Sequence, residues 1–229
     1  MTVRSRFAAV LIALLAISGG LLTGACEDKK ATSEIHLKKG TELIAQGKFD
    51  AAIVELKKAA DLNQDSMQAR LLLGNAYRGL KKYDDALAAY RDAKKVDRYV
   101  VTPHIAQADM QVELGRIDVA TSELNHVIEL DPRNLQALVM LGKVSLMPLK
   151  GATEPAKLSV ERAELNLEAA IGIAPDNIEA HYHLARAAEI LGHKPKAVAA
   201  WTKVVELAKS KPGAEKMAKD ATDALVRLK

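Results

Sequence analysis

Six histidines are the residues of this chain whose chemistry first suggests a metal site, and their spacing tests that idea. His36, His104 and His181 lie several tens of residues apart at equivalent places of a repeated pattern, which indicates packing roles. His181 and His183 are separated by one residue, so on a helix they point to different faces. The sequence also lacks a His-Glu-x-x-His pattern, a glycine loop for phosphates and a nucleophile elbow. We therefore expect no metal, no cofactor and no catalytic residues.

The one cysteine of the chain, Cys26, lies directly after an N-terminal apolar segment. Arg4 and Arg6 precede an apolar run over residues 7–22, and the small residues of Thr23-Gly24-Ala25 follow it. A positive start, an apolar stretch and small residues at its end are typical of a secretory signal peptide. A single cysteine leaves no partner for an intrachain disulfide and excludes a cysteine-based metal site.

Small residues followed directly by Cys26 resemble the processing site of bacterial lipoproteins. The resemblance implies a signal peptide over residues 1–25, lipid on Cys26 and a short polar tether over residues 26–32. More than one acyl chain is needed for stable anchoring, and lipoproteins of this kind carry three. The resemblance further implies a bacterial envelope protein whose repeats face the periplasm, with the inner and outer membranes both left open. The alternative is an uncleaved anchor, because residues 7–25 are long enough to span a bilayer.

The rest of the chain carries a pattern that begins at residues 33, 67, 101 and 135, a period of 34 residues. In its plainest copy, Met67–Val100, two sets of apolar residues at helical spacing flank a turn at Lys81-Lys82. Gly74 and Ala86 lie where the two helices would cross, and only small side chains let helix axes approach closely there. The period predicts a tandem array of helical hairpins.

Several residues of this copy resemble the pattern of the tetratricopeptide repeat family, and two later prolines match its last position. The resemblance implies an all-α, right-handed superhelical solenoid of five helix-turn-helix repeats, over residues 33–66, 67–100, 101–134, 135–177 and 178–211. The residues that carry it are Leu73, Gly74, Tyr77, Tyr83, Ala86, Tyr90, Ala93, Pro132 and Pro175.

The fourth repeat is nine residues longer than the others, and the chain continues beyond the fifth. The extra residues fall within Leu146–Lys157, where two prolines and a glycine exclude a continuous helix. This insertion is either a tolerated surface loop or a binding loop. Residues 212–229 begin with Pro212-Gly213 and then place apolar residues on one helical face, which predicts a capping helix, with a partner-binding helix as the alternative.

The composition of the chain limits the kinds of partner that it can bind. A chain of 229 residues with 49% hydrophobic residues can bury a large core in a linear solenoid. The formal net charge of +4 is modest, and no basic stripe is interleaved with aromatic residues. We therefore expect no binding to nucleic acid.

The resemblance implies that the second, fifth, ninth and twelfth positions of each first helix are exposed on a concave groove. Carried over to this chain, the fifth positions form an apolar stripe on which a peptide or helix of a partner could dock. In the alternative, these apolar residues pack between adjacent first helices. The implied groove residues are Leu37, Thr41, Leu71, Asn75, Arg78, Ile105, Asp109, Val112, Val139, Lys143, Tyr182 and Arg186.

These features together predict a membrane-anchored scaffold for protein–protein interactions in the bacterial envelope. Its partners would be envelope proteins or peptides, and its process the assembly of a pilus or secretin, polysaccharide export or a cell-wall enzyme complex. The competing class is an enzyme or small-ligand-binding protein whose site is hidden on the solenoid.

Overall fold

A computed structural model describes residues 28–149 and 151–229, and all regular elements in this part of the chain are helices. The predicted signal peptide and Cys26 lie outside the described residues. The expectation of an all-α helical-repeat fold is confirmed. No helix among the described residues is both long and apolar enough to span a bilayer.

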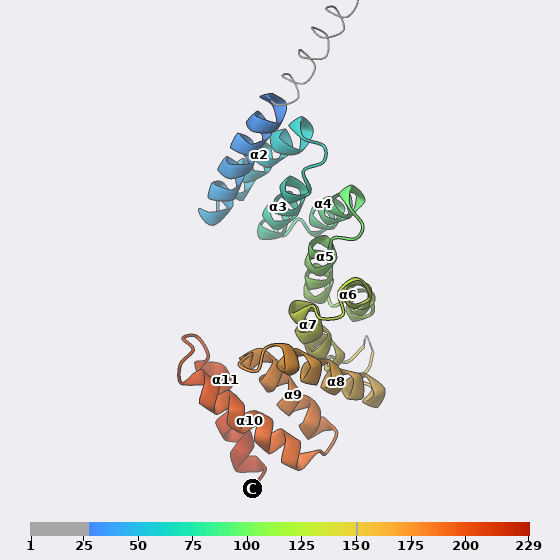
Figure 1. Cartoon of the computed structure of the whole chain (residues 1–229), viewed down its shortest axis with the longest axis vertical. Coiled ribbons are helices and arrows are strands. Elements are labelled where there is room, and N and C mark those ends of the chain that lie inside the picture. Colours follow the sequence, from blue (N-terminus) through green and yellow to red (C-terminus); the bar gives the residue numbers. More distant parts are fainter. Residues whose placement is uncertain (1–27, 150) are drawn as a thin grey trace, which may run out of the picture. The chain divides into compact units, whose positions relative to one another are not determined.

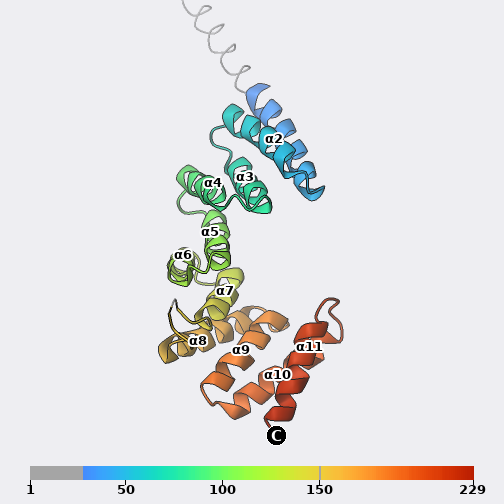
Figure 2. The same ribbon diagram turned by 180° about the vertical axis from the view of Figure 1, so that it is seen from behind.

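The chain divides into two compact units, the first ending at Arg98 and the second beginning at Tyr99. Within each unit, helices that follow one another in sequence pack side by side (Figures 1 and 2). Unit 1 contains a helix over residues 28–45, α2 (Phe49–Leu62), α3 (Met67–Gly79) and α4 (Tyr83–Val96). Unit 2 contains α5 (Val101–Glu113), α6 (Ile117–Leu130), α7 (Leu135–Ser145), α8 (Lys157–Ile173), α9 (Ile178–Ile190), α10 (Lys194–Ala208) and α11 (Glu215–Arg227).

The first helices α3, α5, α7 and α9 begin at the residues where the sequence period begins. Three of them are capped in the same way. The side chains of Ser66, Asn134 and Asn177 each accept a hydrogen bond from the backbone N–H three residues on. Such caps satisfy N–H groups that have no partner inside the helix, and each stabilises it by about 1 kcal/mol. These residues therefore fix where three of the pairs start.

The turn inside a pair has one recurring backbone conformation. Gly47, Gly115 and Gly192 have φ of +72°, +68° and +73°, and Lys81 has φ of +58° at the equivalent position. Glycine suits this left-handed region because it has no Cβ, so the lysine is the strained member of the set.

The two helices of a pair approach most closely where a small residue of the first faces a large residue of the second. Gly40 leaves room for Leu56, since a Cβ there would lie 2.6 Å from Leu56 Cγ. The ring of Tyr90, which is fully buried, fills the space beside Gly74 in the same way. The large residue lies one helical turn beyond the buried alanine that the sequence marks, Ala86 in the second pair. The predicted close crossing is thus made by glycine against a large side chain.

The helix that opens unit 1 already includes residues 28–32, which the sequence assigns to the polar tether. The physical reason is that no glycine or proline interrupts the chain between Asp28 and Gly40. Ser33, expected at the start of the first repeat, lies inside this helix. Its buried hydroxyl donates to the Ala59 carbonyl at 2.7 Å.

The inserted residues and the C-terminal helix α11 both belong to unit 2. α7 ends at Ser145 and α8 begins at Lys157, so the insertion lies between the two helices of its pair. α11 packs on α10, with Ala221 and Ala224 fully buried. Its Met217, Leu225 and Leu228 contact the same core cluster from the edge.

We expect Gly74→Ala to lower the free energy of unfolding by about 1–3 kcal/mol, because the new Cβ overlaps the buried Tyr90 ring. The matched control is Gly172→Ala, a helical glycine with no atom within 4 Å of the Cβ position. That change should raise stability by about 0.5–1 kcal/mol. Urea unfolding followed by circular dichroism measures both, and equal stability of the Gly74 variant and the parent would contradict the crossing.

Candidate functional site

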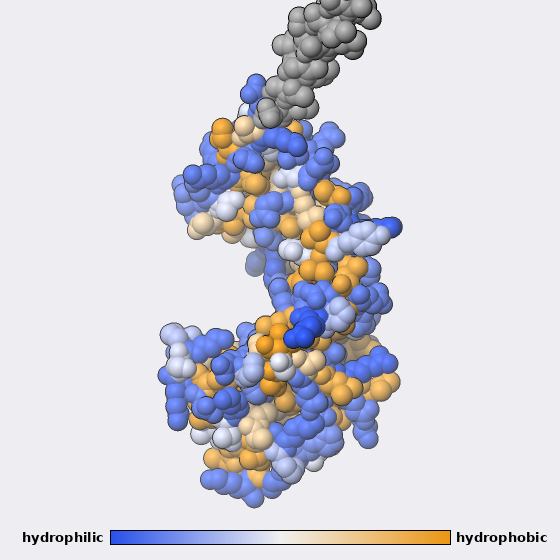
Figure 3. Space-filling model, viewed as in Figure 1, coloured by the Kyte–Doolittle hydropathy of each residue, from blue (hydrophilic) through white to orange (hydrophobic). Residues whose placement is uncertain are grey.

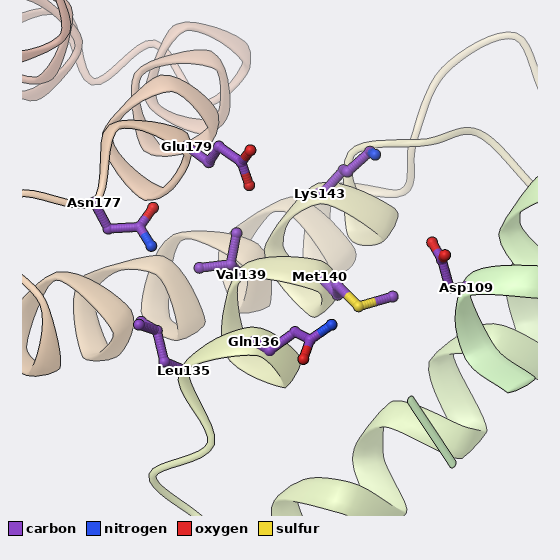
Figure 4. A pocket seen from close by; sticks show the side chains of 8 residues that line it. All are labelled: Asp109, Leu135, Gln136, Val139, Met140, Lys143, Asn177 and Glu179. Carbon is purple, nitrogen blue, oxygen red and sulfur yellow. The ribbon is translucent and has the colours of Figure 1, made fainter. Parts of the chain in front are cut away.

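The first helices of three successive pairs in unit 2 line an open groove of about 400 Å³. We call it the α7 groove, because α7 forms its floor between α5 and α9 (Figure 4). Its lining residues are Asp109, Leu135, Gln136, Val139, Met140, Lys143, Asn177 and Glu179.

The floor of the α7 groove is apolar and its rim is polar. Figure 4 shows Val139 and Met140 on α7, between Glu179 on α9 and Asp109 on α5. Lys143 extends from α7 one turn beyond Val139 and is exposed. An apolar floor with a few polar groups around it is the usual composition of a site that binds a peptide or small ligand.

Two amide side chains complete the rim. Gln136 is exposed, so its amide can donate and accept hydrogen bonds. The Oδ1 atom of Asn177 accepts from Ala180 N at 2.9 Å, which orients the amide at the start of α9. Its nitrogen keeps two donors. Amides placed in this way can pair with the backbone of an extended chain.

The structure brings together three of the predicted groove residues, Asp109, Val139 and Lys143, in this one site. The central members of the predicted apolar stripe are mostly buried instead. Leu71, Ile105 and Val139 are only 8%, 7% and 7% exposed. The alternative interpretation, in which they pack within the core, therefore describes them better than an exposed stripe does. Val112 likewise packs against the core of unit 2 at its edge.

In unit 1, the predicted groove residues make internal contacts. Tyr90 donates its hydroxyl to Asn75 Oδ1 at 2.7 Å, and Thr41 donates to the Leu37 carbonyl at 2.8 Å. Leu37 itself packs against the core of this unit, and Arg78 is half-buried. These residues do not join the α7 groove.

At the far end of unit 2, α11 packs beside the predicted groove residues of α9, so that Tyr182 is half-buried while Arg186 stays exposed. Tyr182 donates to Asp220 of α11 at 2.8 Å, and Arg227 lies 3.5 Å from Glu189. Burial and this hydrogen bond raise the pKa of Tyr182. Together with Arg186, these residues surround a smaller hollow of about 300 Å³. The predicted stripe therefore does not continue to Tyr182 as open surface.

The recurring histidines join the two helices of a pair through glutamates. His36 Nδ1 lies 2.6 Å from Glu55 Oε2, and His104 Nδ1 lies 2.8 Å from Glu123 Oε2, at a sequence separation of 19 each time. His181 Nε2 instead lies 2.8 Å from the Pro175 carbonyl. The described residues contain no group of three or more metal-ligating side chains.

These contacts shift the pKa of two buried glutamates. Hydrogen bonds from His36 and then Lys39 lower the pKa of Glu55 from 4.5 to about 2. Burial raises the pKa of Glu164, but hydrogen bonds from His193 and Lys196 outweigh burial and leave it below its usual value. Both glutamates are thus held as anions by neighbours that donate hydrogen bonds.

His183 does not line the α7 groove, but the charge of Lys143 at the groove rim acts on it. Burial first, and then the positive charges of Arg186 and Lys143, lower its pKa to about 4. The imidazole is therefore neutral near pH 7, and the positive charge at this end of the groove comes from Lys143.

Fold and site together define a helical-repeat protein whose first helices in unit 2 line an open groove. Residues 37–99, which include α2 to α4, match the family model of the tetratricopeptide repeat. The crystal structure of MamA is similar, with 22% identity, a TM-score of 0.63, and 80% of this chain and 96% of that chain covered. YrrB, a tetratricopeptide-repeat protein with an unusual peptide-binding site, has 17% identity, a TM-score of 0.63, and coverage of 88% and 97%.

A curated relative, the Protein CTR9 homolog of Arabidopsis thaliana, is 29% identical over 111 residues. The match includes 47% of this chain and 10% of the relative, so it spans about a tenth of the relative's length. At these identities, the likeness to the solved structures shows the fold alone.

Sequence reasoning missed five residues of the α7 groove. Gln136 and Glu179 occupy the second position of their first helices, which the family pattern marks as exposed, so the sequence carried a signal for both. The family pattern does not mark the other three, because their exposure depends on how α7 and α9 pack. These are Leu135, Met140 and Asn177.

We expect unit 1 to lose stability as the pH falls from 4.5 to about 2, because Glu55 is protonated in the unfolded chain before the folded one. A carboxyl with a lowered folded pKa stabilises above its unfolded pKa and loses that contribution below it. In Glu55→Gln this part of the pH dependence should be absent. Thermal melts of both proteins across this range measure the difference, and parallel curves would contradict the assignment.

Proposed function

We propose that this protein is an anchored scaffold that binds a segment of a partner protein in the α7 groove. The observation that carries the proposal is the groove itself, in which three successive first helices combine an apolar floor with a polar rim. The similarity to YrrB supports it, since that protein of the same fold is described by its peptide-binding site.

The groove suits an extended or helical peptide with mixed character. An apolar side chain of the peptide would pack on Met140 and Leu135, which are half-buried and so retain surface to offer. The amides of Gln136 and Asn177 would pair with its backbone. Lys143 and Glu179 carry opposite charges at the rim, so they favour one orientation of a peptide that has an acidic and a basic end.

Anchoring is the second part of the proposal and rests on the sequence. The apolar run, the small residues and Cys26 support processing as a bacterial lipoprotein, which would hold the repeats at a membrane surface in the periplasm. A scaffold held there would recruit envelope proteins to a machine that assembles at the membrane. Secretin or pilus assembly, polysaccharide export and cell-wall enzyme complexes are processes of that kind.

We expect Met140→Asp to weaken peptide binding at least tenfold, because a charge on the floor must be desolvated against the bound apolar side chain. Lys143→Glu should mainly slow association and change its salt dependence. The probe is a peptide selected from a displayed random library on residues 27–229, which contain every contact described above. Its affinity and rates are measured by surface plasmon resonance.

The matched control for the groove is Ile190→Asp, which adds the same charge at a residue of α9 that is 51% exposed and outside the groove. Circular dichroism confirms that each variant is folded. If the selected peptide binds the groove variants as tightly as the parent but loses affinity for the control, then binding runs through another surface.

We expect Cys26→Ser to block lipid attachment, because the serine hydroxyl does not replace the thiolate as the lipidated nucleophile. Cells grown with radioactive palmitate should label the parent and leave the variant unlabelled. Label that still enters the variant would show that lipid is attached elsewhere, and a parent that takes up no label would indicate the uncleaved apolar segment instead.

A further inference from the structure

The first described helix is already formed at Asp28, and it belongs to the packed body of unit 1. Its Ser33 hydroxyl donates to the Ala59 carbonyl of α2, and further along Gly40 lies against a leucine of α2. The chain from residue 28 onward is therefore a rigid part of the unit and does not act as a spacer. In the sequence, Cys26 stands only two residues before Asp28.

This short connection limits how far unit 1 can lie from a lipid on Cys26. An extended chain spans at most about 3.6 Å per residue, so residue 28 lies within about 7 Å of residue 26. The headgroup layer on each side of a bilayer is itself about 5–8 Å thick. In a protein held by acyl chains on Cys26, the edge of unit 1 that contains residue 28 therefore meets the membrane surface.

We call this edge of unit 1 the anchor edge. It consists of residues 28–32 together with the end of α2, the start of α3 and the end of α4, because successive helices run in opposite directions. Figure 1 shows the first described helix beginning beside the end of α2. Hydrophilic residues cover much of the visible surface of unit 1 in Figure 3. Such a surface suits a charged headgroup layer and not the hydrocarbon interior.

The anchor edge has an excess of positive charge that the opposite edge lacks. Among exposed residues, the ranges 28–32, 57–70 and 91–98 at the anchor edge contain seven basic and five acidic ones. The ranges 41–52 and 75–85 at the opposite edge contain three basic and four acidic ones. The membrane-facing end of unit 1 is thus its positive end.

Lys29 and Lys30 are the described cations nearest to Cys26 in the sequence. Both are exposed, and neither has an ion-pair partner among the described residues. Two lysines farther from the edge are neutralised inside the fold instead, since Lys39 Nζ lies 3.0 Å and Lys58 Nζ 3.7 Å from Glu55 Oε1. The two ammonium groups at the edge are left to pair with an anion outside the protein.

We infer that the anchor edge lies on the membrane surface, where Lys29 and Lys30 bind the phosphates of anionic lipids. This orientation depends on the anchoring at Cys26 proposed above. A lysine ammonium is a compact charge that pairs well with phosphate, and each lysine near an anionic surface strengthens attachment about fivefold.

Unit 2 has no such attraction to the surface. Residues 28–98 contain 15 basic and 11 acidic residues, whereas residues 99–229 contain 16 basic and 17 acidic ones. Lipid and lysines together therefore hold unit 1 at the membrane, and the α7 groove of unit 2 is left for a partner protein.

The test attaches residues 26–229, the processed chain of this proposal, to vesicles through its one cysteine. Phosphatidylcholine vesicles that carry a maleimide lipid trap the thiol, and a second set also contains phosphatidylglycerol as the anionic lipid. The rate of coupling, divided by the rate with a soluble maleimide, reports how often Cys26 stands at the surface. We expect phosphatidylglycerol to raise this ratio at least fivefold and high salt to remove the increase.

The variant that carries both Lys29→Glu and Lys30→Glu should lose the increase. Its matched control carries Lys48→Glu and Lys82→Glu, the same change of charge at exposed residues of the opposite edge, and should keep at least half of it. Circular dichroism checks that both variants are folded.

A second measurement maps the contact after coupling. A water-soluble ester acylates exposed lysines, and mass spectrometry reports the rate at each one. Lys29 and Lys30 should react at least threefold more slowly on the anionic vesicles than on neutral ones, whereas Lys82 should react equally on both.

The proposal is overturned if the anionic lipid leaves the coupling ratio unchanged, or if the control variant loses the increase as fully as the Lys29 and Lys30 variant. Protection of Lys82 in place of Lys29 and Lys30 would also overturn it, because another edge would then face the membrane. The maleimide supplies the attachment in this test, so its result is separate from the palmitate labelling that judges the natural anchor.

Discussion

The architecture depends on one steric constraint, the close crossing of the two helices in each pair. Gly40, Gly74 and Gly142 each give up the volume of a side chain so that a leucine or tyrosine from the second helix can enter. Where the first helix has alanine instead, as at Ala108 and Ala185, that residue is also fully buried. With the crossing fixed, the apolar faces of neighbouring pairs meet in register, and the first helices of unit 2 lie side by side to form the α7 groove.

Much of this fold follows from the sequence, because the constraint leaves a periodic trace. Small residues, large residues and capping residues recur at fixed offsets, so the starts of α3, α5, α7 and α9 can be placed to the residue. No periodic pattern in the sequence indicates that residues 28–32 are helical. It results from the absence of a stop signal after Asp28, which a periodic pattern beginning at Ser33 does not reveal.

The site is less predictable because exposure is a tertiary property. The family register selects Asp109, Val139 and Lys143 correctly as neighbours, since it fixes the helix face on which they lie. It does not tell how closely α5, α7 and α9 pack, and so it cannot distinguish the half-buried Met140 from the buried Ile105. The covering of Tyr182 by Asp220 likewise depends on where a helix outside the repeat pattern comes to rest.

Helix α11 covers the apolar side of α10, the second helix of the fifth pair. Stacked pairs leave an apolar side on the last member, and a second chain could add there head to tail and go on adding, as in an open filament. The face that α11 turns to α10 fills that side with Ala221 and Ala224, and Lys216, Lys219 and Asp223 are exposed. The charges on this outer face oppose the docking of a further apolar helix face.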